Sequence, residues 1–182
     1  MKESVTGTPG TVVGVSIPIP EPYGSELQGR RASYGDPLAE VTPAHITLLG
    51  PTFVSSSDLD ELVEHLEDCA RHVDPFVVAL RGTGTFRPIS DVVFVQLARG
   101  ISSCEQLEQG IRKGRWGSAL SFPYHPHVTI AHDVAQTELD RAFEELTKFT
   151  AIFEVRSFHL YNQDGDGSWI PVREFPLGEA GG

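Results

Sequence analysis

The sequence contains little cysteine, little positive charge and no long apolar run, and each shortage excludes a class of protein. Cys69 and Cys104 are the only cysteines among 182 residues, and they do not form a Cys-x-x-Cys pair, so no disulfide framework is indicated. No apolar run approaches the roughly 20 residues that cross a bilayer. The first four residues, MKES, lack the apolar core of a secretory signal. We therefore expect a cytoplasmic protein with no membrane partner.

Positive charge is scarce, because 14 basic residues face 25 acidic ones and the net charge is −11. Capture of a long nucleic-acid duplex needs a basic surface, so this balance argues against such a partner. A local basic pocket is still compatible with it, and so is a short RNA end or a small nucleotide as the partner. The apolar fraction, 40 %, is that of a globular protein. The length fits one ordinary domain, or two small lobes that share a core.

One phrase, His-apolar-Thr-apolar-apolar, occurs twice, as HITLL at residues 45–49 and as HVTIA at residues 127–131. With seven histidines in the chain, template counting expects only about 0.03 such phrases by chance. Each phrase is typical of a β-strand, on which alternate side chains share a face. His45 and Thr47 therefore point one way, as do His127 and Thr129, and the apolar residues between them face the core.

The rest of the chain predicts alternating strands and helices. Strands are predicted at 11–19, from His45 to Gly50-Pro51, at 76–86, at 92–97, at the His127 phrase, at 152–161 and at 168–173. Helices are predicted near 58–73, 104–113 and 138–149, with Ser57, Ser103 and Thr137 as their N-caps. Residues 20–40 are rich in proline and glycine and predict a long loop. The ends, residues 1–10 and 178–182, are expected to be flexible, and residues 11–177 to form a single domain.

These elements form an internal repeat. A strand, a His-x-Thr strand, a helix and a strand occur over residues 11–86. The same order recurs over 92–161, with a helix inserted after its first strand. Repeated units of this kind usually bury a shared core. We therefore expect a pseudo-symmetric molecule in which a cleft between the two halves brings the histidines together.

The two phrases and their spacing resemble the 2H phosphoesterase superfamily, and in particular its branch of 2′-5′ RNA ligases and RNA 2′,3′-cyclic phosphodiesterases. The resemblance covers most of the chain, although only the two motifs are distinctive. It implies an α+β, bilobal, pseudo-two-fold fold in which two mainly antiparallel sheets with flanking helices surround a central cleft. It also implies catalysis by His45 and His127, phosphate binding by Thr47 and Thr129, and no requirement for a metal or cofactor.

The residue types suit that chemistry. Opening a cyclic phosphate needs a base that deprotonates water and an acid that protonates the leaving ribose oxygen, and histidine can serve as either near neutral pH. Threonine hydroxyls can donate hydrogen bonds to the nonbridging phosphate oxygens. We predict a metal-independent phosphodiesterase that hydrolyses a 2′,3′-cyclic phosphate on RNA ends or nucleotides, or that cleaves or forms a 2′-5′ linkage. His45 is assigned as acid and His127 as base, and the similarity of the motifs leaves the reverse order open.

Three further residues are candidates for substrate binding. Tyr124 precedes the second motif and either stacks on a base or packs against the fold. Arg115 belongs to the densest basic cluster and either attracts a phosphate or complements the dipole of the preceding helix. Arg87 either borders the cleft or is a solvated strand end.

A zinc site is the main alternative for the histidines of the second motif. His125 and His127 can share a face, but His132 has the opposite strand parity and is expected to point away. No metal is therefore predicted. Two other functions stay open: a non-catalytic nucleotide- or RNA-binding module of the same fold, and a hydrolase of a small cyclic phosphate such as ADP-ribose cyclic phosphate. A monomer is expected.

Overall fold

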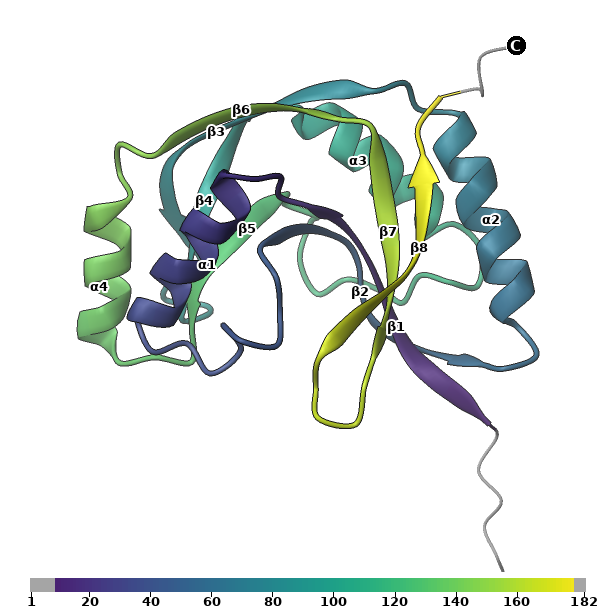
Figure 1. The fold of residues 1–182 in the computed structure, drawn as a ribbon, viewed down its shortest axis with the longest axis horizontal. Coiled ribbons are helices and arrows are strands. Elements are labelled where there is room, and N and C mark those ends of the chain that lie inside the picture. Colours follow the sequence, from purple (N-terminus) through teal and green to yellow (C-terminus); the bar gives the residue numbers. More distant parts are fainter. Residues whose placement is uncertain (1–8, 179–182) are drawn as a thin grey trace, which may run out of the picture.

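Two four-stranded antiparallel sheets and four helices make up the fold, which confirms the predicted α+β class (Figure 1). The computed structural model describes residues 9–178, so most of the expected flexible ends lie outside the described residues. The strands are β1 (Gly10–Pro18), β2 (His45–Ser55), β3 (Phe76–Thr85), β4 (Val92–Arg99), β5 (His127–His132), β6 (Thr150–Val155), β7 (Ser157–Gln163) and β8 (Trp169–Pro176). The helices are α1 (Tyr23–Ser33), α2 (Leu59–Arg71), α3 (Ile101–Ile111) and α4 (Gln136–Glu145). Among the described helices, none is long and apolar enough to span a membrane.

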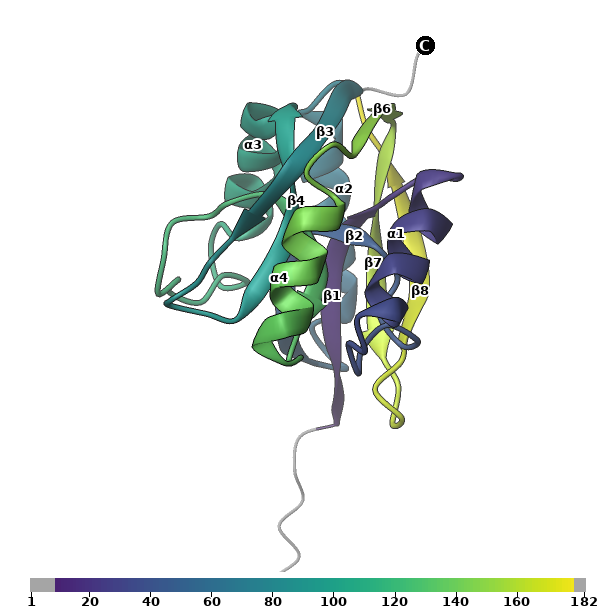
Figure 2. The same ribbon diagram turned by 90° about the vertical axis from the view of Figure 1, so that its left-hand side faces the viewer.

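The two motif strands occupy matching places at the edges of the two sheets. The first sheet has the order β2-β1-β7-β8 and the second the order β5-β4-β3-β6. Edge strands β2 and β5 contact each other, so both motifs lie where the sheets meet. In Figures 1 and 2 the helices flank the sheets in two pairs, α1 with α4 and α2 with α3. This arrangement puts the motifs between the halves of the molecule, as the repeat predicted.

The internal repeat is present, and it is more regular than the sequence suggested. The first half runs β1-α1-β2-α2-β3, and the second runs β4-α3-β5-α4 before β6 and β7. The halves exchange their last strands: β3 pairs with β4 of the second half, and β7 pairs with β1 of the first. Helix α1 likewise contacts β5, and α3 contacts β2. A single hydrophobic core joins both halves, because neither half completes a sheet without the other.

The prediction of a loop at residues 20–40 is wrong over the part of the segment where α1 forms. Its N-terminus follows Pro20 and Pro22, and a proline at the start of a helix loses no intrahelical hydrogen bond. Leu27 and Arg31 are the only buried residues of the helix. A helix that buries one apolar side chain has no apolar stripe, so hydrophobic periodicity does not detect it.

Three other expectations need correction. The predicted strand at 152–161 is two strands, β6 and β7, which belong to different sheets because the chain crosses between the sheets at Arg156. Strand β2 continues past Gly50-Pro51 to Ser55, where it still pairs with β1. The expected N-caps are also wrong: the helices begin after Asp58, Gly100 and Ala135, and none of these residues makes a side-chain cap hydrogen bond.

Candidate active site

A cleft of about 520 Å³ lies between the sheets and contains both motifs. His45, Thr47, His127 and Thr129 all line it, so the structure brings together the four residues that the sequence singled out. The alternation of faces is confirmed, since the apolar residues between them are buried. Apolar contact with the core thus fixes each strand and leaves each histidine beside a hydroxyl on the cleft side.

The two histidine rings are held in the same way. Nδ1 of His45 lies 2.6 Å from the carbonyl oxygen of Pro43, and Nδ1 of His127 lies 2.7 Å from that of His125. A carbonyl oxygen can only accept, so Nδ1 carries the hydrogen and Nε2 is the basic atom of the neutral ring. Nε2 of His45 lies 3.1 Å from Oγ1 of Thr47, whose hydroxyl can donate to it. Each ring therefore keeps Nε2 as the atom that can exchange a proton.

Burial lowers the pKa of both histidines below the ordinary value of 6.5. For His45, the hydrogen bond to the Pro43 carbonyl opposes the shift and the positive charge of Arg31 adds to it. For His127, the hydrogen bond to the His125 carbonyl opposes the shift, and the neighbouring imidazoles of His125 and His45 add to it. Both rings are therefore biased toward the neutral form in the free protein.

Aromatic packing fixes the His127 ring. Phe86 meets it edge-on at 5.0 Å between ring centroids, and Phe94 packs against it at 5.1 Å. The His125 ring is stacked with it at 6.3 Å between centroids. These contacts restrict the ring to the orientation that its Nδ1 hydrogen bond requires.

A β-bulge follows the threonine of each motif, at Leu48 in β2 and at Ile130 in β5. Such an extra residue reverses the alternation of faces beyond it. His132 therefore lines the cleft, which corrects the expectation that it points away, and Gly50 has the matching place in β2. The parity argument failed because it assumed an unbroken strand.

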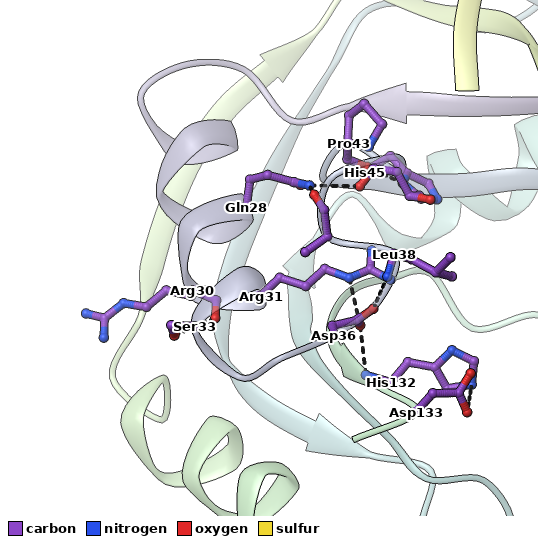
Figure 3. A network of polar contacts seen from close by, with 12 residues as sticks. Gln28, Arg30, Arg31, Ser33, Asp36, Leu38, Pro43, His45, His132 and Asp133 are labelled. Carbon is purple, nitrogen blue, oxygen red and sulfur yellow. Dashed lines mark hydrogen bonds and ion pairs between the residues drawn. The ribbon is translucent and has the colours of Figure 1, made fainter. Parts of the chain in front are cut away.

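Helix α1 organises one end of the cleft, although the sequence predicted no element there (Figure 3). Nε2 of Gln28 donates to the carbonyl oxygen of Thr42 at 3.0 Å and also binds the carbonyl of Ala39. Nε of Arg31 donates to Oδ2 of Asp36 at 2.8 Å. These contacts hold the segment that leads to Pro43 and hence to the carbonyl that positions His45.

Asp36 joins this helix to the second motif strand. Its Oδ2 also accepts a hydrogen bond from the backbone N–H of His132 at 2.9 Å, and Oδ1 accepts from the N–H of Leu38 at 2.8 Å (Figure 3). The Asp36 side chain is completely buried, and that of Arg31 is 5 % exposed. The buried ion pair of Arg31 and Asp36 therefore ties α1 to β5, the second motif strand.

Another part of the cleft wall is aromatic. Tyr161 of β7 and Trp169 of β8 line it. The Trp169 ring packs over Gly14 of β1, where an added Cβ would meet it at 3.1 Å. Sequence reasoning missed these two residues, because only the pairing of β7 with β1 and of β8 with β7 brings them to the motifs. It also missed Arg31, which lies in a helix that the sequence did not predict.

The three other candidates from the sequence do not line the cleft. The Tyr124 hydroxyl donates to the carbonyl oxygen of Thr47 at 2.8 Å, and its ring packs against the core. The guanidinium of Arg115 binds one carboxylate within α2 at 2.8 Å and another, on the residue just before α2, at 3.0 Å. That of Arg87 binds Asp140 of α4 at 2.7 Å. Hydrogen bonds and ion pairs within the fold thus occupy all three, and a substrate contact is not indicated for any of them.

Within residues 9–178, no group of three His, Cys, Asp or Glu side chains lies close enough together to hold a metal ion. His132 lies 3.5 Å from Oδ1 of Asp133, and this pair is not joined by a third such ligand. Cys69 and Cys104 are free thiols.

Comparison with known proteins gives a family and a fold. Residues 19–167, which contain both motifs, match the 2′-5′ RNA ligase superfamily. A protein of Oceanobacillus iheyensis named "Putative phosphoesterase" is 27 % identical over 145 residues, which cover 79 % of this chain and 85 % of the relative. One of the same name from Halalkalibacterium halodurans is 26 % identical over 168 residues, or 91 % of this chain and 97 % of the relative.

Solved structures with the same fold include E. coli LigT complexed with 3′-AMP, with a TM-score of 0.67 and 19 % identity over 92 % of this chain and 98 % of LigT. E. coli LigT complexed with NADP⁺ has a TM-score of 0.64 and 19 % identity, with the same coverage of both chains. TT0787 of Thermus thermophilus has a TM-score of 0.65 and 21 % identity, covering 92 % of this chain and 99 % of that one. At these identities the likeness establishes the fold.

Proposed function

The chain belongs to the 2′-5′ RNA ligase superfamily, and we propose that it is a metal-independent phosphodiesterase that acts on RNA ends or small nucleotides. The reacting group is a 2′,3′-cyclic phosphate, or a 2′-5′ linkage that the same site cleaves or forms. One observation carries this proposal: two histidines in one cleft share the same Nδ1–carbonyl anchor, which leaves Nε2 of each ring for proton transfer. Binding alone does not need two titratable groups held in this way.

In the proposed hydrolysis, Nε2 of one neutral histidine takes a proton from water as the water oxygen attacks phosphorus. The bond from phosphorus to one ribose oxygen breaks, and Nε2–H of the other, protonated histidine supplies the proton to that oxygen. The hydroxyls of Thr47 and Thr129 donate to the nonbridging oxygens, on which negative charge accumulates. Each positioned proton transfer contributes about 10²–10⁴-fold in rate.

We assign the base to His45 and the acid to His127, the reverse of the order expected from sequence. The positive charge of Arg31 acts on His45 and disfavours its protonated form. Beside burial, the groups that lower the pKa of His127 are the imidazoles of His125 and His45, which carry no permanent charge. In the ligation direction the roles exchange, since the same protons move backwards.

A small nucleotide suits the cleft better than a long duplex. E. coli LigT has been solved with 3′-AMP and with NADP⁺, and this chain has the same fold. The exposed faces of Tyr161 and Trp169 offer stacking surfaces for a base. The two free thiols are compatible with a reducing compartment, and we propose the cytoplasm as the location.

Phosphorus NMR tests this function. A 2′,3′-cyclic mononucleotide and a short RNA with a cyclic phosphate end are incubated with the protein in excess EDTA. Conversion to a monoester supports the proposal, and the shift of the product identifies the oxygen that keeps the phosphate. Binding of both substrates without conversion, with or without added divalent metal, would instead identify a binding module. Conversion only after metal is added would contradict metal independence.

A further inference from the structure

We propose that Arg31 is the phosphate anchor of the cleft, binding an anionic phosphate oxygen of the substrate beside His45 through its two Nη groups. This inference rests on the proposed function for the identity of the substrate, but its test does not require turnover. The residue comes from α1, the helix that the sequence did not reveal, and it has no partner of the same kind in the second half of the repeat.

Arg31 is a largely buried cation whose hydrogen bonds are only partly made. The Arg31 side chain is 5 % exposed, and its Nε is bound to Asp36. Within residues 9–178, neither Nη nitrogen of Arg31 donates a hydrogen bond, although a guanidinium has five N–H groups. Both Nη groups are therefore free to donate to an acceptor inside the cleft, whose wall includes Arg31. A phosphate oxygen matches the forked geometry of the two groups.

The wall of the cleft carries very little charge. Among the described residues that line the cleft, Arg31 alone carries a permanent positive charge, and none is a carboxylate. The histidines are biased toward neutrality by burial. Asp36 offsets part of this charge, so the guanidinium attracts a phosphate mainly through the donors of its two Nη groups.

The guanidinium of Arg31 is held rigidly in place. Asp36 is fixed by the backbone N–H groups of Leu38 and His132, and it in turn fixes Nε of Arg31 (Figure 3). In the same figure the neighbouring Arg30 points away from this network. A cation whose position is set in advance loses little conformational freedom when it binds, which raises the affinity it supplies.

The second half of the repeat has no counterpart. Arg112, which follows α3, binds Glu108 of the same helix at 2.8 Å and does not line the cleft. The cleft therefore has a direction, with a fixed cation next to His45 and none next to His127. A substrate with one phosphate would be oriented with that phosphate toward the β2 side.

The test is calorimetric titration with adenosine 3′-monophosphate, inorganic phosphate and adenosine. Arg31→Lys keeps a charge for Asp36 but loses the second pair of donors, and Arg31→Met with Asp36→Asn removes the ion pair as a unit. We expect both to bind the two phosphate-bearing ligands about 10- to 100-fold more weakly, as for the loss of a hydrogen bond to a charged group. Adenosine affinity should stay within about threefold of the wild-type value, because adenosine carries no phosphate and an uninvolved substitution changes free energies by only about 0.5 kcal/mol.

Two controls separate anchoring from structural support. Arg30→Gln changes the net charge equally on the same helix, and Asp36→Asn breaks the same ion pair while leaving the cation in place. Arg30→Gln should retain phosphate affinity, and Asp36→Asn should lose clearly less of it than the Arg31 variants, because the cation stays but is less firmly held. Equal loss in Asp36→Asn and in the Arg31 variants, with all of them folded by circular dichroism, would contradict the proposal and assign the pair a structural role.

Steady-state kinetics of the Arg31 variants show which phosphate of the substrate Arg31 binds, and they separate this inference from the proposed function. A raised KM with an unchanged kcat for a 2′,3′-cyclic mononucleotide places the anchored group at the reacting phosphate. A raised KM seen only with a dinucleotide places the anchored group at the neighbouring phosphodiester. Either of these two results supports the anchor. Arg31-dependent phosphate binding by a protein that hydrolyses no substrate would refute the function alone. Active enzyme whose Arg31 variants bind phosphate normally, or wild-type protein that binds none at millimolar concentration, would refute the anchor alone.

Discussion

Replacing Arg31 with methionine tests the buried ion pair that ties α1 to the second motif strand. Methionine fills much of the same volume but leaves the carboxylate of Asp36 buried without a cation, since the Asp36 side chain has no exposed surface. Breaking a buried pair in this way costs about 3–5 kcal/mol of unfolding free energy. The two backbone N–H groups that bind Asp36 remain, so we expect the lower end of this range. At about 2–4 °C per kcal/mol for a chain of this size, a loss of about 3 kcal/mol lowers Tm by about 6–12 °C.

Urea denaturation and differential scanning calorimetry of four proteins measure this effect: wild type, Arg31→Met, Asp36→Asn and the double variant. Asparagine removes the buried charge, so the double variant should recover more than half of the stability that Arg31→Met loses. A loss below about 1 kcal/mol in Arg31→Met would mean that the backbone donors suffice for Asp36. A double variant no more stable than Arg31→Met would likewise refute the reasoning.

Three further predictions concern the cross-link between the motifs, the histidine pKa values and one helix start. Tyr124→Phe removes the hydrogen bond to the Thr47 carbonyl and should lower the unfolding free energy by about 0.5–1.5 kcal/mol, measured in urea; an unchanged midpoint would contradict the bond. Because folding lowers the pKa of His45 and His127, the unfolded chain binds more protons below pH 6.5. The unfolding free energy should therefore fall as pH drops through and below 6.5. Between pH 8 and 5, the denaturation midpoint should fall less in the His45→Gln, His127→Gln double variant than in the wild type. An equal fall in both proteins would exclude these rings as the cause. Gly100→Ala places a Cβ on a backbone with φ of 90° and within 2.9 Å of a β3 carbonyl oxygen. It should lower the unfolding free energy by at least about 1–2 kcal/mol, measured in urea. An unchanged unfolding free energy would contradict the left-handed geometry at this helix start.

The sequence was sufficient for the four motif residues because their signal is local. Alternation along a strand fixes the face of His45 relative to Ile46, whatever the rest of the chain does. The same rule failed for His132, since a bulge at Ile130 shifts the alternation and nothing in the phrase HVTIAH marks it. The repeat then supplied the non-local step, that the two motif strands meet.

The rest of the cleft depends on packing that no local pattern records. In the sequence, nothing distinguishes Arg31 within a segment rich in proline and glycine. It lines the cleft because its side chain is ion-paired with Asp36, which is buried five residues later. Trp169 and Tyr161 reach the cleft because β7 crosses to the first sheet at Arg156, inside what reads as a single strand. Tyr124 was left undecided between packing and base stacking, and its hydrogen bond to the first motif favours packing.

The central claim is that two histidines share the proton transfers of one phosphodiester reaction. The most direct test is the single-turnover rate of His45→Ala and His127→Ala on whichever cyclic phosphate the wild-type protein hydrolyses in EDTA. Each variant should be slower by about 10²–10⁴-fold at pH 7, and the double variant should be little slower than either single one. A rate near that of wild type in either single variant, with the fold intact, would contradict the two-histidine mechanism.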